Sequence, residues 1–432
     1  MRPPTQPPNA NGSLVLPMRF LAVGLLTLAL LSLTYPWHLD MLRGSFYAPH
    51  LLTFVHVNTL GLIGAVIFGA SYQMLPIVLQ TALAAPRAAQ FSWWLYVAGL
   101  VLFVAGMEQG TAVVLGLGGS LTYAAVVLYI YTVGYTLRAA PFRDTTWWHV
   151  AVATAALGTG ASLGLLLALS KYVGFLSGLT LPTLAAHATL MVGGWVTPLL
   201  TGVAYRLVSM FTLTEDRLRD DWAQGELCLT AGGAWMLAAS LLLGVGQVVS
   251  LLGSVILLAG IGLFIIQIFR LYRLRLRRSP DIHIQFLVAA MAFGLLGAGL
   301  LAWGFLTGRG PTDPIWIAAG WLAIVGWAQT SILGFLHKIG PFLTWMHRYG
   351  PIAGVRPVPM LEDLYSRRLA LLACAAWVVG VALAAMVPLA SVSWAPVAAA
   401  ISLMIGGAIV VLNALRVARH WFGWTAPVAG IS

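Results

Sequence analysis

The stretch GLIGAVIFGASYQMLP (residues 61–76) decides the fold of this chain, because much of its pattern occurs twice more. The second copy is GWVTPLLTGVAYRLVS (194–209), and the third is GWAQTSILGFLHKIGP (326–341). Each copy has a glycine, a second glycine eight residues later, and an aromatic ring three residues further on. A pattern that recurs at a long, regular spacing predicts that one structural unit is repeated along the chain.

Composition places these copies in a membrane. The chain has 432 residues, of which 60% are hydrophobic and 8% are charged, whereas about a quarter of the residues of a soluble domain are charged. A helix needs about 20 apolar residues to cross a bilayer. On this criterion we predict twelve spans, at 17–36, 49–79, 92–109, 112–137, 147–170, 180–211, 227–246, 249–272, 283–306, 315–345, 369–389 and 394–416. The second, sixth and tenth spans are longer than a bilayer requires, which indicates tilting or extension beyond its surface.

The second glycine of each copy sets the period of the repeat. Gly69, Gly202 and Gly334 are 133 and 132 residues apart and fall on the second, sixth and tenth spans. The sequence therefore predicts an all-α integral membrane protein of three pseudo-symmetric four-helix units. The pair formed by Gly61 and Gly69 would admit a neighbouring helix, or a flat ligand, close to the backbone.

The basic residues predict the orientation in the membrane. The formal net charge is +11, and of 23 Lys and Arg residues only Arg43, Lys171 and Arg309 fall in loops after odd-numbered spans. Loops rich in Lys and Arg stay in the cytoplasm, so we expect both termini to be cytoplasmic. The charge then marks topology and contact with anionic lipid rather than nucleic acid. A prokaryotic cytoplasmic (inner) membrane is the expected location.

The two ends of the chain are predicted to be tails. Residues 1–15 are polar and rich in proline, and they lack the parts of a signal peptide. We expect a disordered tail over 1–15, a single membrane domain over 16–420, and a C-terminal tail over 421–432. Cys228 and Cys374 lie in apolar segments and form no CxxC motif.

Twelve spans in quasi-threefold sets of four resemble the main subunit (subunit I) of the heme-copper oxidase superfamily, which includes cytochrome c oxidases and nitric oxide reductases. The segments HVNTLGLIGAVIFGASYQMLP (56–76) and LPTLAAHATLMVGGWVTPLLTGVAYRLVSMF (181–211) resemble small stand-alone relatives of that subunit. The resemblance implies a heme-b-binding protein in respiratory electron transfer, or in nitric oxide or oxygen handling. It also implies a respiratory partner subunit, cytochrome c or quinol. A twelve-span heme and copper family linked to nitric oxide stress is a second resemblance.

His56 lies about two turns into the second span, where the resemblance implies a ligand of low-spin heme. A neutral imidazole suits iron when its other nitrogen has a hydrogen-bond partner. The alternative is a hydrogen bond from His56 to a hydroxyl or amide of a neighbouring helix.

His187 lies near the start of the sixth span, four residues before Met191, where many members of the superfamily have a tyrosine. Counted from the repeat glycines, His187 stands at −15 and His56 at −13, a difference of about 200° around a helix. The two histidines are therefore not symmetry mates. His187 either binds heme from another helix face, pairs with Met191 around a soft metal such as Cu(I), or has no metal role.

The standard heme-copper centre cannot be built from this sequence. The seventh span, 227–246, has none of the adjacent histidines that the family uses for copper, and the tenth lacks the family's HxH. The position that matches His56 in the tenth span is Trp321. These departures exclude a conventional proton-pumping oxidase, and copper remains an option only at another site. If the chain is an enzyme, the resemblance implies a heme-dependent oxidoreductase.

Secondary candidates lie toward the cytoplasmic ends of the spans. His337 occupies the aromatic position that Tyr72 and Tyr205 hold in the other copies. It is either an interfacial residue or a ligand or proton carrier facing a cavity that the two tyrosines also line. His283 follows Asp281 at a helix start, where N-capping by the aspartate would explain the local chemistry.

A second class of function needs no cofactor. The missing copper ligands are also compatible with a transporter, or with a structural or assembly subunit that kept the fold. No lysine or carboxylate is expected at the middle of the sixth or eighth span, so proton pumping is not predicted.

Overall fold

The computed structural model describes residues 14–276 and 281–421. Over these residues the protein is helical, and twelve of its helices are long and apolar enough to cross a membrane. The predictions of an all-α integral membrane protein and of twelve spans are confirmed. The two predicted tails, 1–15 and 421–432, lie almost entirely outside the described residues.

Nine of the twelve spans are continuous α-helices. They are α1 (Val15–His38), α4 (Pro86–Gln109), α5 (Ala112–Ala139), α6 (Thr145–Val173), α9 (Asp220–Leu243), α10 (Gln247–Arg273), α11 (Ile282–Leu306), α14 (Arg367–Met386) and α15 (Ala395–Trp421). Short 3₁₀ turns connect some of them, at Leu39–Arg43, Glu215–Arg217, Gly350–Ile352 and Leu361–Leu364.

The three spans that carry the repeated motif are each interrupted by a π-helical segment. They consist of α2 (Pro49–His56), Val57–Gly64 and α3 (Ala65–Val78); α7 (Thr180–Thr189), Leu190–Val196 and α8 (Thr197–Thr212); and α12 (Ile315–Trp321), Leu322–Gln329 and α13 (Thr330–Arg348). The π-helical segments begin 133 and 132 residues apart, the same spacing as the motif glycines. Such segments are rare and are frequent near functional sites.

A hydroxyl group donates a hydrogen bond to a backbone carbonyl of each π-helical segment. Thr197 (2.8 Å) and Thr330 (2.9 Å), each the first residue after its segment, donate in the second and third copies. In the first copy Tyr96 on α4 donates instead, at 2.6 Å. Each of these carbonyls also accepts the backbone N–H of the residue five positions later, so the hydroxyl adds a second hydrogen bond to the irregular turn.

The motif glycines let the preceding span pack closely against each span that carries the motif. A Cβ added to Gly61 would lie 2.7 Å from Thr27, and one added to Gly69 would lie 2.8 Å from Phe20. The other pairs behave alike: Gly194 with Ala156, Gly202 with His149, Gly326 with Phe293, and Gly334 with Phe286. In every copy, two glycines eight residues apart contact two side chains that lie seven residues apart on the preceding span. The prediction that these glycines admit a neighbouring helix is confirmed, and Thr27 and Phe20 occupy the space that a flat ligand would need beside Gly61 and Gly69.

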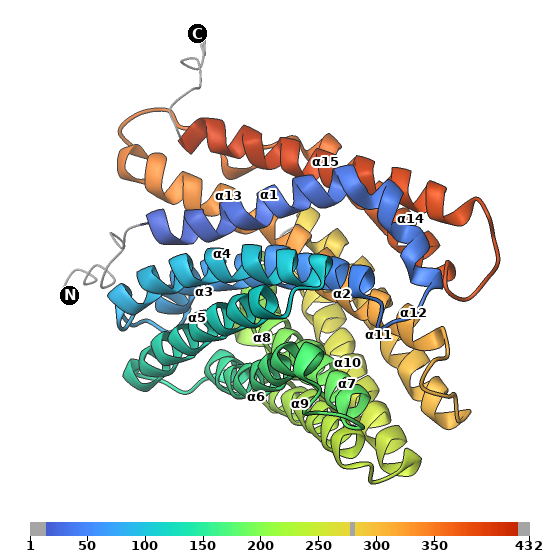
Figure 1. Cartoon of the computed structure of the whole chain (residues 1–432). Coiled ribbons are helices and arrows are strands. Elements are labelled where there is room, and N and C mark those ends of the chain that lie inside the picture. The colour runs from blue at the N-terminus through green and yellow to red at the C-terminus, as the bar shows by residue number, and fades with distance from the viewer. Residues whose placement is uncertain (1–13, 277–280, 422–432) are drawn as a thin grey trace.

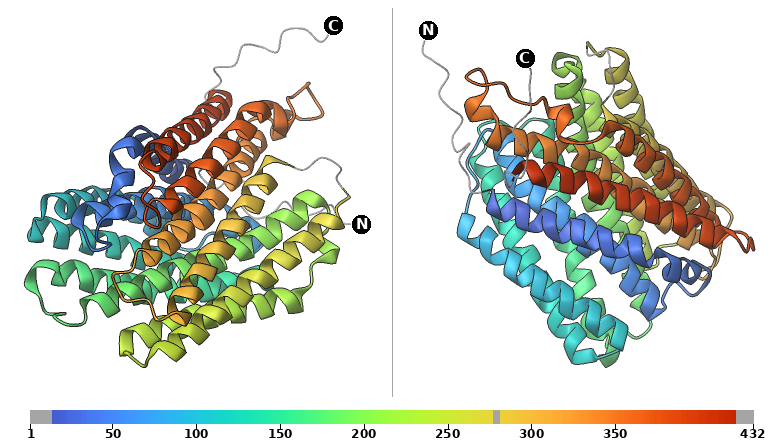
Figure 2. Two further views of the ribbon diagram at one scale, coloured as in Figure 1. Left: turned by 90° about the vertical axis from the view of Figure 1, so that its right-hand side faces the viewer. Right: turned by 90° about the horizontal axis from the view of Figure 1, so that it is seen from above.

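The remaining helices pack in a regular order. The most extensive pairings are α4 with α5, α9 with α10, and α14 with α15. α5 also packs on α6, and α10 on α11. The first and last helices, α1 and α15, lie side by side and close the bundle (Figures 1 and 2).

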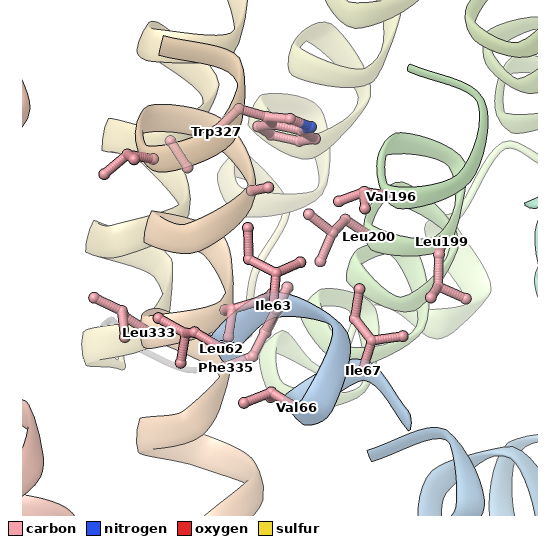
Figure 3. Packing of buried hydrophobic residues seen from close by; sticks show 14 of the residues in the cluster. Leu62, Ile63, Val66, Ile67, Val196, Leu199, Leu200, Trp327, Leu333 and Phe335 are labelled. Atoms are coloured by element: carbon pink, nitrogen blue, oxygen red, sulfur yellow. The ribbon is translucent and has the colours of Figure 1, made fainter. Parts of the chain in front are cut away.

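The three interrupted spans meet in the centre of the bundle. Figure 3 shows Ile63 of the first, Leu200 of the second and Trp327 of the third turned toward a common apolar core. The indole Nε1 of Trp327 donates a hydrogen bond to the hydroxyl of Thr197, 3.0 Å away. This bond ties the second and third copies together in the core.

The predicted boundaries differ most at the seventh span. We predicted 227–246, whereas α9 is Asp220–Leu243. The acidic residues Asp220 and Asp221 form the first turn of the helix, where negative charge is favourable. The earlier start brings Glu226 inside a membrane-spanning helix.

Candidate functional site

His56 is the last residue of α2, immediately before a π-helical segment. Its ring Nδ1 lies 2.7 Å from the carbonyl oxygen of Leu52, one turn earlier. Because a carbonyl oxygen only accepts, Nδ1 carries the proton, and Nε2 of the neutral ring carries the lone pair. The hydrogen-bond partner that a metal-binding histidine requires is therefore the backbone of its own helix.

His187 lies on α7, three residues before the second π-helical segment. Its Nδ1 lies 2.8 Å from the carbonyl oxygen of Gly160 on α6, so this ring too has the tautomer with a free Nε2 lone pair. A Cβ at Gly164 would lie 2.7 Å from Cε1 of His187. Gly164 therefore lets the imidazole lie directly against the backbone of α6.

The structure brings these two histidines together. Their ring centres are 6.5 Å apart and their planes are within 16° of parallel. The ring of Phe103 on α4 packs 4.9 Å from that of His56. Within the part of the chain that the structure describes, neither Nε2 atom has a hydrogen-bond partner. Two neutral imidazoles arranged in this way can bind a transition metal or a heme iron.

Met191 packs against Gly160 on α6. It is in the π-helical segment, and a Cβ added to Gly160 would lie 2.9 Å from its sulfur. Gly160 therefore contacts Met191 and also accepts the hydrogen bond from His187. A thioether at this position packs against the same turn of α6 that orients the histidine.

Polar and charged groups lie where these helices leave the membrane. The ammonium group of Lys171 lies 4.2 Å above the ring of Tyr47 and acts electrostatically on His56. Burial, and then the neighbouring Tyr172, raise the pKa of the Tyr47 hydroxyl above its ordinary value. His50 pairs with Glu108 at 2.6 Å, and both side chains are exposed.

The three side chains in the aromatic position of the repeat lie in separate places. Tyr72 is buried and shares a hydrogen bond of 2.9 Å with Ser92. Tyr205 is fully buried and packs edge-on against His149. His337 is buried, and its ring stacks on Phe286.

His283 is buried near the start of α11. Asp281 precedes this helix, as predicted, but its carboxylate does not cap the helix. It accepts a hydrogen bond of 2.6 Å from Lys338 and lies 3.9 Å from His283. The predicted capping bond is replaced by an ion pair, because Lys338 reaches the carboxylate from α13.

Sequence reasoning missed one pair of ionisable residues. His149 on α6 and Glu226 on α9 are in contact, and both side chains are fully buried. Glu226 lies one residue before the predicted seventh span, 227–246. Among the described residues no group of three or more His, Cys, Asp and Glu side chains is placed to hold a metal ion.

No protein-family model matches this chain, and no curated protein is significantly similar to it. Functional conclusions therefore depend on the geometry of the sites themselves.

Proposed function

We propose that this chain is a membrane protein that binds heme b between His56 and His187. The supporting observation is the pair of nearly parallel rings with centres 6.5 Å apart. An imidazole nitrogen lies about 2.0–2.1 Å from a bound transition metal, so two imidazoles on opposite sides of one iron hold their ring centres about 6 Å apart. The spacing of the two ring centres therefore matches that of two histidine ligands on one heme iron, supplied by the second and sixth spans.

The chain's own groups hold the two rings in position. The carbonyl oxygens of Leu52 and Gly160 fix the tautomer of His56 and His187 and increase the basicity of each ligand nitrogen. Gly164 provides the room that the second ring needs. Lys171 is the nearby cation for the carboxylates of a heme, at the end of the bundle where Tyr47 also lies.

Two histidine ligands favour electron transfer. A bound heme supplies a one-electron redox centre, and filling both axial positions leaves none open for a diatomic gas. Nitric oxide or oxygen handling at this site would need one histidine to leave the iron. We therefore place respiratory electron transfer first, with cytochrome c or quinol as redox partner and a respiratory partner subunit beside this chain.

The helix packing supports three four-helix units around a pseudo-threefold axis, like that of heme-copper oxidase main subunits. The pairings of α4 with α5, α9 with α10, and α14 with α15 occupy equivalent places in such units. The π-helical segments and the glycine contacts keep the same period. The basic loops support cytoplasmic termini in a prokaryotic cytoplasmic membrane.

Absorption spectra of the purified protein, oxidised and dithionite-reduced, test this function. We expect a b-type spectrum that is lost or strongly altered in His56→Ala and in His187→Ala. His50→Ala is the matched control, because His50 lies on the same helix but is exposed and paired with Glu108. Its spectrum should be unchanged.

A colourless, normally folded protein would contradict the proposal. That result would favour the cofactor-free alternative, a transporter or a structural or assembly subunit. A heme spectrum that survives both substitutions would show that the heme is held elsewhere.

A further inference from the structure

His149 and Glu226 form a fully buried pair between α6 and α9. Nε2 of the imidazole lies 3.0 Å from Oε2 of the carboxyl group, and both side chains are 0% exposed. Ionisable side chains inside a membrane-spanning segment are rare and are functional candidates, because hydrocarbon penalises them. The pair lies outside the proposed heme site.

The hydrogen bonds of this pair indicate how many protons it holds. Nδ1 of His149 lies 2.7 Å from the carbonyl oxygen of Thr145, so Nδ1 carries a proton. Two lone pairs would repel at 3.0 Å, so one further proton lies between Nε2 and Glu226. The hydroxyl of Thr230 donates to the other carboxyl oxygen at 3.1 Å. The pair is therefore neutral overall.

Packing alone does not explain the histidine. The close contact that Gly202 makes with His149 is made by Gly69 with Phe20 and by Gly334 with Phe286. Phenylalanine thus fills this position in two of the three copies.

Packing does not explain the glutamate either. Glu226 stands seven residues before Gly233, which contacts Leu257 on the adjacent helix α10. The glycines in the corresponding contacts are Gly99 and Gly380, and the residues seven positions before them are Ser92 and Ala373. Only the second copy combines a histidine with an acid.

Polar groups continue on both sides of the pair. The hydroxyl of Tyr205 is buried without a hydrogen-bond partner among the described residues, and Glu226 is its acidic neighbour. The Tyr205 ring lies edge-on to His149, with centres 5.7 Å apart. On the other side, the hydroxyl of Thr145 donates at 2.7 Å to Asp220, which is exposed. These groups lead from a surface carboxylate to the buried pair.

The other elements around the pair supply no further buried charge. From α10, Phe264 and Gln267 face this region, and the amide of Gln267 donates to the carbonyl oxygen of Arg219. Arg219 itself pairs with Asp221 at the surface.

We propose that His149 and Glu226 form a proton-binding site that exchanges one proton with solvent at the Asp220 end of the bundle. Tyr205 is the neighbouring hydroxyl that can hydrogen-bond to the carboxyl group when the proton leaves. A solvent water takes or supplies the proton, and no electron moves. The site does not depend on heme.

Infrared difference spectroscopy between neutral and alkaline pH tests the proposal. Surface carboxylates stay ionised throughout this range, because their ordinary pKa is about 4. We expect one coupled carboxyl and imidazole signal, lost in Glu226→Gln and also in His149→Phe. Glu108→Gln is the control, because Glu108 also pairs with a histidine but is exposed. A difference spectrum unchanged by Glu226→Gln would overturn the proposal and leave a static hydrogen bond.

A double variant tests the proposal in a protein that is expected to fold. His149→Phe combined with Glu226→Ala reproduces the Phe286 and Ala373 arrangement, and replacing a buried pair by apolar residues is often neutral or stabilising. It should fold and lack the signal; a double variant that folds and keeps the signal would also overturn the proposal. Because the signal comes from side chains, the His56→Ala variant should still show it, which separates this test from that of the heme.

Discussion

The rings of His56 and His187 lie nearly parallel, with centres 6.5 Å apart, although their helices orient them in different ways. His56 donates to Leu52, a carbonyl of its own helix, whereas His187 donates to Gly160 of a neighbouring helix. The arrangement of the pair therefore depends on how closely α6 approaches α7, and that approach can be changed without touching either histidine.

Gly164→Ala should disturb the heme site without removing a ligand. Its Cβ would lie 2.7 Å from Cε1 of His187 and would push the ring away from α6. We expect weakened heme retention and a mixture of ligation states, measured by heme content and absorption spectra. Gly158→Ala on the same helix is the control, because its nearest neighbour is a flexible Ile130 methyl group at 3.4 Å. Equal spectra for the two variants would argue against a ligand role for His187.

Gly69→Ala should destabilise the bundle. The added Cβ would lie 2.8 Å from Phe20 and 2.9 Å from the carbonyl oxygen of Pro17, and backbone cannot move aside easily. Overpacking of this kind costs about 1–3 kcal/mol. Thermal unfolding in detergent should show a lower midpoint, whereas Gly299→Ala, with open space around its Cβ, should be neutral or slightly stabilising. A midpoint no lower than that of wild type for Gly69→Ala would refute this packing role.

Thr330→Val should weaken the third π-helical segment. Its hydroxyl donates to the Val325 carbonyl, which also accepts the backbone N–H of Thr330, and it accepts a hydrogen bond of 3.0 Å from the Trp377 indole. The substitution therefore leaves the buried indole N–H without its partner and removes one of the two hydrogen bonds to the carbonyl. The expected loss of stability is about 1–3 kcal/mol. Thr159→Val provides the comparison, since Thr159 is exposed and should change stability by less than about 0.5 kcal/mol. Similar unfolding midpoints for both variants would count against the role of this hydroxyl.

Lys338→Met should lower the free energy of unfolding more than a surface substitution does. Lys338 and Asp281 are nearly buried and lie 2.6 Å apart. Removing one partner of a buried ion pair costs about 3–5 kcal/mol. Arg309→Met breaks the exposed pair with Asp313 and should cost about 0–1 kcal/mol. Chemical unfolding of both variants measures the difference, and equal losses would show that burial of the Lys338 pair does not matter.

The sequence predicted the membrane class, the twelve spans and the period of the repeat, because hydrophobic length and glycine spacing are local properties. It did not predict the π-helical segments, since residues such as Val57 and Leu190 carry no signal for a wider turn. The candidates His56 and His187 could be named, but not their proximity, which depends on Gly160 and Gly164 of another helix.

The burial of two further groups, His337 and Glu226, could not be predicted from the sequence. The burial of His337 could not be predicted because the charged Lys338 follows it; Asp281 pairs with that lysine, and both residues of α13 are buried. Glu226 was missed because its helix begins earlier than hydropathy indicated.

Near-infrared magnetic circular dichroism of the oxidised protein is the direct test of heme binding between His56 and His187, because this signal reports the axial ligands of a low-spin ferric heme. We expect the signature of two imidazole ligands in the native protein, and a change to a histidine–methionine signature or to high-spin heme in His187→Met. A signature of any other ligand pair in the native protein, or an unchanged one in His187→Met, would contradict heme binding between His56 and His187.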